Sequence, residues 1–270
     1  MEQYSEQVLY RDSEMSVFNH QNGRHIEIDG ANIYYEIQGN PDGPALLLLH
    51  GGFGNIETFN AIATHLGEQY RLIGIDSRGQ GKSTLGTLPL TYRRIEQDVA
   101  AVLAHLAVKR CRVIGHSDGG ITALRLAATG TVEIDKLVTI GAHWTLAAGD
   151  PTRAIYAGVT AARWREMFPQ SFDSYQAQNP APDFDKLASA LVGMWLASDP
   201  DGYPGETVRQ IACDLLVIRG DEDPLVSREH AVELADRVRG ARLANLPFAG
   251  HSPHEEKPAW IFSLLNEFYA

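Results

Sequence analysis

Short apolar runs alternate along the chain with longer stretches in which apolar residues recur every three or four positions. Apolar runs of this length are typical of strands buried on both faces, and the three-to-four-residue repeat is typical of helices with one buried face. We predict strands at 24–28, 31–38, 45–49, 71–76, 112–115, 137–141, 215–219 and 241–246. We predict helices at 56–66, 92–106, 119–128, 228–238 and 258–268. This alternation indicates an α/β fold with a mostly parallel, doubly wound sheet.

Residues 144–205 interrupt the alternation. They are helical in composition, with apolar repeats at 154–164 and 187–196, and they hold six of the chain's 13 prolines. We therefore predict a small helical cap here, inserted in a core formed by 23–143 and 206–270. We expect most aromatic side chains of the cap to form its own core and a few to line a ligand pocket, since ligand sites favour clefts with aromatic walls.

The composition is acidic, with 34 Asp and Glu against 23 Lys and Arg. An excess of negative charge repels phosphates, so we expect neither nucleic acid nor an anionic membrane as a partner. Residues 1–22 are polar and weakly patterned, so we predict a loose N-terminal arm. Their first residues lack the basic and apolar segments of a secretory signal, so we expect no such signal. Cys111 and Cys213 are too few for a disulfide framework, so we expect reduced thiols and a cytoplasmic protein.

The strongest chemical signal is the sequence Gly-His-Ser-Asp-Gly at 115–119, which follows a predicted strand and opens a predicted helix. This is the context of a G-x-S-x-G nucleophile elbow, a sharp strand-to-helix turn that exposes a serine hydroxyl. Glycines are needed there because only very small residues let the strand and the helix approach so closely. Ser117 is therefore our candidate nucleophile.

A serine nucleophile needs a base, and the base needs an acid that orients it. In chains with such an elbow, the acid and then the histidine follow the serine along the sequence. After the strand at 215–219 come Asp221 and Asp223, and after the strand at 241–246 comes His251. His251 is the candidate base, because it follows a glycine in the first loop beyond the last strand. Asp223 lies deeper in its loop, directly before a proline, and we favour it over Asp221 as the acid.

Two further patterns invite other interpretations. His254 competes with His251 for the role of base, and their H-x-x-H spacing is also found at metal sites. We expect no metal, because no helix runs through Pro253 to hold both rings on one face. The sequence Gly-Lys-Ser at 81–83 ends like a phosphate-binding loop, but no helix follows to hold phosphate at its N-terminus. We therefore predict neither a metal nor another cofactor.

Acyl transfer also needs two N–H donors for the oxyanion that develops on the substrate. The main-chain N–H of Asp118, the residue after the nucleophile, supplies one. We expect the other in the Gly-rich loop after the strand at 45–49, with Gly52 preferred and Phe53 as the alternative. His50 at the start of this loop is expected to shape it through a structural hydrogen bond.

Together these motifs resemble the α/β-hydrolase superfamily. Those that carry the resemblance lie between residues 24 and 269, at 50–52, 76–83, 115–120, 220–226 and 250–251. A narrower resemblance, at 117–124 and 223–226, is to the biphenyl-hydrolase-like (valacyclovir hydrolase) branch. It implies hydrolysis of α-amino-acid esters, with Asp118 binding the ammonium group of the substrate, and the superfamily pattern implies Asp223 as the acid. His116 departs from that branch, which has Trp at this position.

Asp118 thus has two interpretations. Its carboxylate could pair with a cation in the acyl pocket, which favours amino-acid esters. Its side chain could instead be held by a neighbour, with only its backbone taking part in the chemistry. The other substrate contacts are expected from Phe53, Trp144, Trp164 and Trp195.

The sequence therefore predicts a serine hydrolase that cleaves a small carboxylic ester through an acyl-enzyme. One alternative is a C–C bond hydrolase of the meta-cleavage type. Its acidic substrates require a basic residue, for which Arg153, Arg163 or Arg165 in the cap are candidates. An alternative from another class is a ligand-binding receptor on the same fold, without catalysis.

Overall fold

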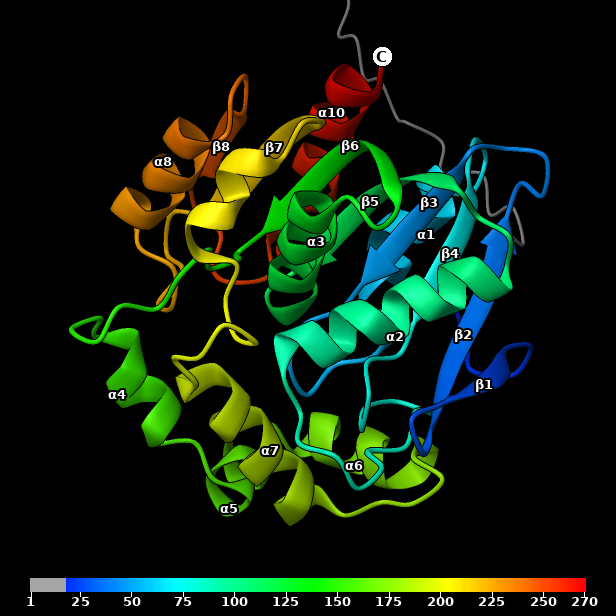
Figure 1. Ribbon diagram of the computed structural model, residues 1–270, viewed down its shortest axis with the longest axis vertical. Coiled ribbons are helices and arrows are strands. Elements are labelled where there is room, and N and C mark those ends of the chain that lie inside the picture. The colour runs from blue at the N-terminus through cyan, green and yellow to red at the C-terminus, as the bar shows by residue number, and fades with distance from the viewer. Residues whose placement is uncertain (1–17) are drawn as a thin grey trace, which may run out of the picture.

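The computed structural model describes residues 18–270, and its strands form one sheet (Figure 1). The strands are β1 (Arg24–Ile28), β2 (Ala31–Gly39), β3 (Ala45–Leu49), β4 (Arg71–Ile75), β5 (Arg110–His116), β6 (Glu133–Ile140), β7 (Asp214–Gly220) and β8 (Arg242–Leu246). Their order across the sheet is β1-β2-β4-β3-β5-β6-β7-β8. β2 pairs antiparallel with β1 and β4, and every other neighbouring pair is parallel. The mostly parallel sheet predicted from the sequence is confirmed.

Helices cover both faces of the sheet. One face packs against α2 (Tyr92–His105), α3 (Asp118–Thr129) and α8 (Arg228–Arg237), and the other against α1 (Asn60–Leu66) and α10 (Pro258–Tyr269). Three short elements complete the core, namely η1 (Ile56–Phe59), η2 (Gly205–Gln210) and α9 (Pro253–Glu256). The predicted helix at 56–66 is thus a 3₁₀ turn followed by α1. The four-residue helix α9 was not predicted, because it is too short to show a repeat.

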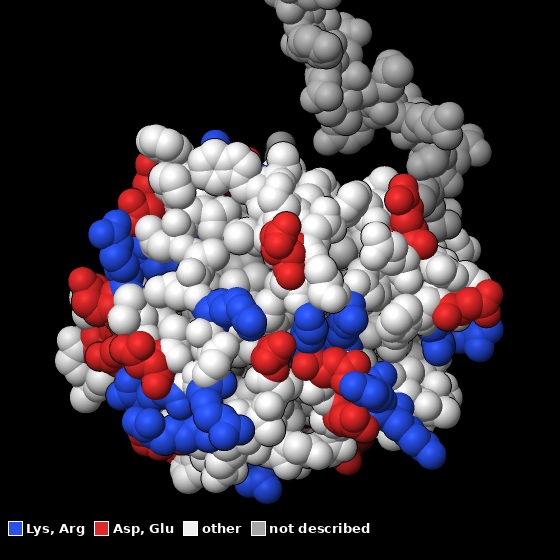
Figure 2. Space-filling view, turned by 90° about the horizontal axis from the view of Figure 1, so that it is seen from above, with Lys and Arg blue, Asp and Glu red and all other residues white. Residues whose placement is uncertain are grey.

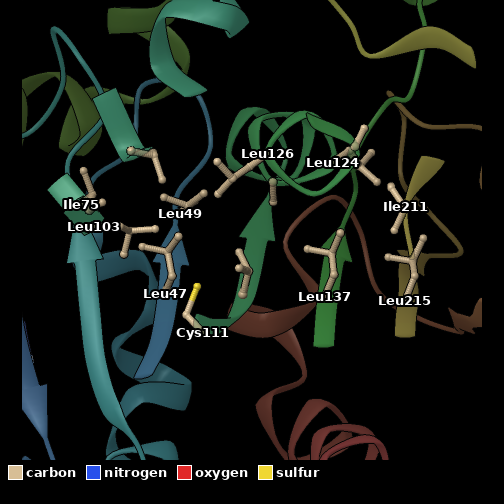
Figure 3. Packing of buried hydrophobic residues seen from close by; sticks show 14 of the residues in the cluster. Leu47, Leu49, Ile75, Leu103, Cys111, Leu124, Leu126, Leu137, Ile211 and Leu215 are labelled. Carbon is tan, nitrogen blue, oxygen red and sulfur yellow. The ribbon is translucent and has the colours of Figure 1, made fainter. Parts of the chain in front are cut away.

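The central strand β3 shows how the two faces are filled. Leu47 and Leu49 lie in the cluster with α2 and α3, whereas Leu46 and Leu48 lie in the cluster with α1 and α10. None of the four is more than 1% exposed, and Figure 3 shows Leu47 near Leu103 of α2. Each fully buried leucine stabilises the fold by about 1.5–3 kcal/mol. The position of β3, and of the loop that follows it, is therefore strongly determined.

Four helices lie between β6 and β7, at the site of the predicted insertion, and we call them the cap helices. They are α4 (Thr152–Ala157), α5 (Ala161–Met167), α6 (Pro169–Gln178) and α7 (Phe184–Leu196). Figure 1 shows them gathered below the sheet, apart from the helices that flank it. The apolar repeat at 154–164 is divided between α4 and α5. The division occurs because α4 ends at Gly158, and the Thr160 hydroxyl then accepts a hydrogen bond from Arg163 N and starts a new helix.

Part of the predicted N-terminal arm is packed against the core. Phe18 is 1% exposed and lies in the cluster with α1, and His20 is buried between two carboxylates. The expectation of a loose arm is therefore wrong for residues 18–20. The physical reason is that the Phe18 ring and the His20 imidazole anchor a segment whose sequence shows no repeat of apolar residues. Residues 1–17 of the predicted arm lie outside the described residues.

Other features of the described chain bear on the predictions from composition. Cys111 and Cys213 are free, and burial raises the pKa of the Cys111 thiol to about 12. No helix in residues 18–270 is both long enough and apolar enough to cross a membrane. On the face shown in Figure 2, basic and acidic side chains lie interspersed rather than in one continuous basic area.

Candidate active site

Ser117 lies on the sharp turn between β5 and α3. Its φ of 50° and ψ of −117° are unfavourable for any residue other than glycine, so the backbone is strained there. The turn is also crowded: a Cβ on Gly115 would lie 2.4 Å from the carbonyl oxygen of Gly119, and a Cβ on Gly119 would lie 2.0 Å from that of Leu49. The glycines are therefore required by the close approach of strand, turn and helix, as expected for a nucleophile elbow.

A continuous chain of hydrogen bonds joins Ser117, His251 and Asp223. The Nε2 atom of His251 lies 3.0 Å from Ser117 Oγ, and its Nδ1 lies 2.9 Å from Asp223 Oδ2. A carboxylate oxygen can only accept, so Nδ1 carries the proton and Nε2 is left to accept from the serine hydroxyl. The three residues come from the ends of β5, β7 and β8, which a parallel sheet brings to one edge.

Asp223 is held as an ionised carboxylate. Its side chain is fully buried, and its Oδ1 accepts hydrogen bonds from the main-chain N–H groups of Leu225 at 2.8 Å and Val226 at 3.1 Å. Burial alone would raise the pKa of Asp223, but the hydrogen bond and charge of His251 and the two N–H donors outweigh it and hold the pKa below its usual range. Asp221 instead pairs with Arg228 and accepts from Asn245, away from His251. The geometry therefore favours Asp223 over Asp221 as the acid that orients His251.

His254, the rival base, lies beneath the site. It is 0% exposed, and its ring is 4.5 Å from that of His116 and 5.3 Å from that of Phe59. Burial, together with the nearby His251, lowers the pKa of His254 to about 3, so its ring is neutral. The helix α9 begins at Pro253, so His251 and His254 do not share a helical face. Within residues 18–270, no group of three or more His, Cys, Asp or Glu side chains is arranged to hold a metal ion.

The Gly-rich loop after β3 passes directly over the nucleophile. A Cβ on Gly51 would lie 3.0 Å from Ser117 Cβ, and a Cβ on Gly52 would lie 2.8 Å from Asp118 Oδ2. His50 shapes this loop as expected: its Nε2 accepts from the N–H of Ser77 at 2.9 Å, so its Nδ1 donates to the Gly51 carbonyl at 2.7 Å. Glycine is needed at both loop positions because any side chain there would meet the elbow.

The side chain of Asp118 is buried in an aromatic setting. Its Oδ1 accepts from the hydroxyl of Tyr92 at 2.7 Å, and the indole N–H of Trp195 lies 2.9 Å and 3.0 Å from its two oxygens. No Lys or Arg of the described residues forms an ion pair with it. Burial raises the pKa of Asp118 in spite of the two hydrogen bonds. The carboxyl group is thus held in place beside Gly52 without a permanent counter-charge.

Three of the four predicted aromatic contacts lie together. The Phe53 ring stacks on Trp164 at 4.0 Å and meets Trp195 edge-on at 5.8 Å. Phe53 has a φ of 57°, and its ring packs against residues of the cap helices. Trp144 does not belong to this group: it packs against His230 at 5.7 Å and under the guanidinium of Arg237 at 3.9 Å. The structure therefore does not bring Trp144 together with the other three rings, because the turn after β6 directs it toward α8.

The three arginines considered for an acidic substrate are engaged within the cap. Arg153 donates to the Leu196 carbonyl at 3.0 Å, and Arg163 donates to that of Gly158 at 2.9 Å. Arg165 lies 4.2 Å from the centre of the Phe172 ring. None of these three contacts involves Ser117.

The loop that resembles a phosphate-binding sequence is bonded internally. The carboxylate of Asp76 accepts from the main-chain N–H groups of Ile56 at 3.0 Å and Lys82 at 2.7 Å. The Ser83 hydroxyl donates to the Asp76 carbonyl at 2.6 Å. The Lys82 ammonium group bonds the His20 carbonyl. These groups hold the loop after β4 and are not directed at a ligand.

Sequence reasoning missed two residues that hold the site. His116 was noted only as a departure from a family pattern, yet its ring contacts the backbone of His251. Its place as the last residue of a buried strand, directly before the nucleophile, was an available signal. Tyr92 was named only as the first residue of a predicted helix. Its hydroxyl gave no sequence signal, because its partner Asp118 lies 26 positions away.

Comparisons with known proteins identify similar chains. A profile of the alpha/beta hydrolase family matches residues 46–264. Serine hydrolase BPHL of Homo sapiens is 29% identical over 237 residues, covering 85% of this chain and 80% of that protein. Esterase YbfF of Escherichia coli is 26% identical over 238 residues, covering 83% and 92%. A meta-cleavage product hydrolase from Pseudomonas fluorescens has the same fold, with a TM-score of 0.78 at 19% identity, covering 93% of this chain and 98% of that one.

Proposed function

The chain belongs to the α/β hydrolase family, and from this premise we propose that it is a serine hydrolase that cleaves a small carboxylic ester. The observation that carries the proposal is the hydrogen-bond chain from Ser117 Oγ through His251 to Asp223, with lengths of 3.0 Å and 2.9 Å. The relatives named as a serine hydrolase and an esterase support the same class of reaction.

The mechanism follows from these contacts. Ser117 Oγ attacks the ester carbonyl while His251 Nε2 takes its proton, and Asp223 stabilises the imidazolium that forms. The N–H groups of Asp118 and Gly52 hold the negative oxygen of the tetrahedral intermediate. His251 then protonates the leaving alcohol. A water molecule, deprotonated by the same base, hydrolyses the acyl-enzyme and restores the serine hydroxyl.

Within this class we propose α-amino-acid esters as the preferred substrates. The support is Asp118, whose buried carboxyl group lies beside Gly52 and has no Lys or Arg partner in the described chain. A substrate ammonium group would supply that missing charge, and a charge-assisted hydrogen bond is about twice as strong as a neutral one. The competing interpretation is structural, since Tyr92 and Trp195 already hold the carboxyl group.

The experiment compares valine benzyl ester with its N-acetylated form, using Ser117→Ala as the catalytic control. A preference for the free amine of tenfold or more in kcat/KM, worth about 1.4 kcal/mol, supports Asp118 as the ammonium anchor. Asp118→Asn should then remove most of this preference. Equal cleavage of both esters would leave Asp118 with a structural role only.

A second outcome addresses the reaction class. If neither ester is cleaved, the ester proposal is wrong. Hydrolysis of an anionic dienoate would then indicate a C–C bond hydrolase, and binding without turnover would indicate a receptor. Arg153, Arg163 and Arg165 already contact other groups of the cap, which argues against a C–C bond hydrolase. The complete hydrogen-bond chain from Ser117 to Asp223 argues against a receptor without catalysis.

A further inference from the structure

A cavity of about 160 Å³ lies where α6 and α7 meet the loops that follow β3 and β4. Its wall includes Phe53, Gln80, Ser171, Tyr175, Gln178 and Leu187. Among residues 18–270, no Asp, Glu, Lys or Arg lines it. A charged ligand would lose its hydration here without gaining a counter-charge, so the lining suits a neutral ligand group.

Gln80 distinguishes this cavity from an ordinary surface hollow. Its side chain is 1% exposed, and neither its Oε1 nor its Nε2 has a hydrogen-bond partner among the described residues. Other polar groups of the wall are already paired. Asn55 Nδ2 donates to Gln178 Oε1 at 3.0 Å, and the Ser171 hydroxyl donates to the Phe53 carbonyl at 3.1 Å. A buried amide that lacks both a donor and an acceptor partner costs stability, which any group offering both would restore.

The backbone around Gln80 is firmly held, so the amide cannot leave the cavity wall easily. Gln80 N donates to the Ser77 carbonyl, and Ser83 N donates to the Gln80 carbonyl, both at 2.8 Å. Asn179, which follows α6, donates to the carbonyls of Gly81 and Ser83 at 2.9 Å. The loop and the cap helices are therefore joined at this point, and a ligand in the cavity has to be met by a rotation of the buried Gln80 side chain rather than by a movement of its backbone.

Phe53 lies between the cavity and the residues beside the nucleophile. It contributes to the cavity wall, and its ring meets Trp195 at 5.8 Å. Trp195 in turn bonds the carboxylate of Asp118, the residue next to Ser117. Phe53 and Trp195 are buried, so a substrate that reacts at Ser117 has to displace the Phe53 ring for its far end to reach Gln80.

We propose that the Gln80 cavity binds a primary carboxamide group carried by the substrate at a distance from the scissile ester. A primary carboxamide presents an N–H donor and a carbonyl acceptor side by side, and so it can pair with both free atoms of the Gln80 amide at once. The amide of Gln80 turns from its covered position to meet it. The proposal rests on the proposed function for the ester, but the cavity can be tested without turnover.

The first test measures binding to the Ser117→Ala protein, which cannot form an acyl-enzyme. Propanamide and N,N-dimethylpropanamide, which lacks the donor, are titrated while the main-chain NMR signals of Gly54, Gly81 and Ser171 are followed. We expect saturable shifts with propanamide and binding about tenfold weaker with the dimethyl compound. Absence of saturable shifts, or equal affinity for the two amides, overturns the proposal.

The second test replaces the amide itself. Gln80→Leu should abolish the difference between the two amides, while Gln170→Leu, an exposed glutamine of α6, should keep it. Because Gln80 makes no side-chain hydrogen bond in the structure, Gln80→Leu should leave Tm unchanged or raise it. A clear loss of Tm would show that Gln80 is a structural group, and the proposal would then be wrong.

The third test uses the active enzyme. Two pairs of esters are compared, and the members of each pair differ only in whether a chain ends in a carboxamide or in a methyl ketone. In the first pair this group ends the acyl chain, and in the second pair it ends the alcohol. We expect a preference of about tenfold in kcat/KM for the carboxamide in one pair, and its loss in Gln80→Leu but not in Gln170→Leu. No preference in either pair overturns the substrate assignment. If no ester at all is cleaved, the proposed function fails, and the binding titration still decides the cavity.

Discussion

His116 donates a hydrogen bond from its Nε2 to the main-chain carbonyl oxygen of His251, at 3.0 Å. A carbonyl can only accept, so Nε2 carries the proton of this ring. Burial, together with the neighbouring rings of His254 and His251, lowers the pKa of His116 well below its usual value, so the ring stays neutral. The residue directly before the nucleophile therefore holds the backbone of the candidate base, while Asp223 holds its side chain.

We expect His116→Phe to lower kcat about tenfold with little change in KM, because one hydrogen bond that positions the base is lost and the ring volume is kept. His116→Gln, whose amide can still donate, should retain more activity than His116→Phe. Steady-state kinetics on one ester across pH 5.5–9 would test this. Equal activities of the two variants would show that only packing matters at this position.

Substitutions of the two aspartates in the loop after β7, Asp221 and Asp223, should differ sharply in their effect on kcat. Asp223→Asn removes the carboxylate that orients His251 Nδ1, and we expect kcat to fall by about 10³–10⁴. Asp221→Asn disturbs only a partly exposed group paired with Arg228 and should change kcat less than about threefold. Kinetics of the purified variants, with Tm as a check on folding, would test the assignment. A greater loss in Asp221→Asn would contradict it.

Gly52→Ala should impair catalysis more than stability. The new methyl group would lie 2.7 Å from Trp195 Cζ2 and 2.8 Å from Asp118 Oδ2, so the loop has to move and its N–H leaves the oxyanion. Loss of one such donor lowers kcat by about 10²–10³. Gly193→Ala on α7, where a Cβ meets nothing within 4 Å, is the matched control and should keep full activity. Normal turnover by Gly52→Ala would remove Gly52 from the oxyanion site.

His20 should make the folded state sensitive to pH. Burial lowers its pKa, but the hydrogen bonds and charges of Asp76 at 2.8 Å and Glu57 at 2.5 Å outweigh it and raise the pKa above its usual value. Protonation therefore favours the folded state. This stabilisation is complete below the pKa of the unfolded chain, about 6.5, and is lost as pH rises through the higher folded pKa.

The test compares the free energy of unfolding of the wild type and His20→Gln in urea from pH 5.5 to 9. We expect a loss of about 2–3 kcal/mol at pH 5.5, since two bonds to charged groups are removed, and a smaller loss at high pH. His105→Gln, at an exposed position of α2, should show no such trend. A difference that grows with pH would contradict the assigned protonation state.

Much of the candidate site could be predicted because its parts are local. A strand followed by Gly-x-Ser-x-Gly and a helix defines the elbow within a few residues, and the order of Ser117, Asp223 and His251 follows the order of three parallel strands. Since parallel strands end at a common edge, their loops are brought together by the fold class alone. The same reasoning predicted that Gly52 lies beside the elbow, where the structure has it, and predicted the approximate place of the cap helices.

Other features depend on contacts between distant parts of the chain. Trp144 and Trp195 are both tryptophans near the cap, yet one packs on Arg237 and the other bonds Asp118. His116 meets His251 across 135 positions. The paired or unpaired state of an amide such as that of Gln80 depends on every neighbour that packing brings near it. Sequence alone determined the fold class and the candidate catalytic residues, because these follow from short-range pattern and strand order. Only the tertiary structure decided which side chains hold and line the site, because hydrogen bonds and burial are set by neighbours that no local pattern specifies.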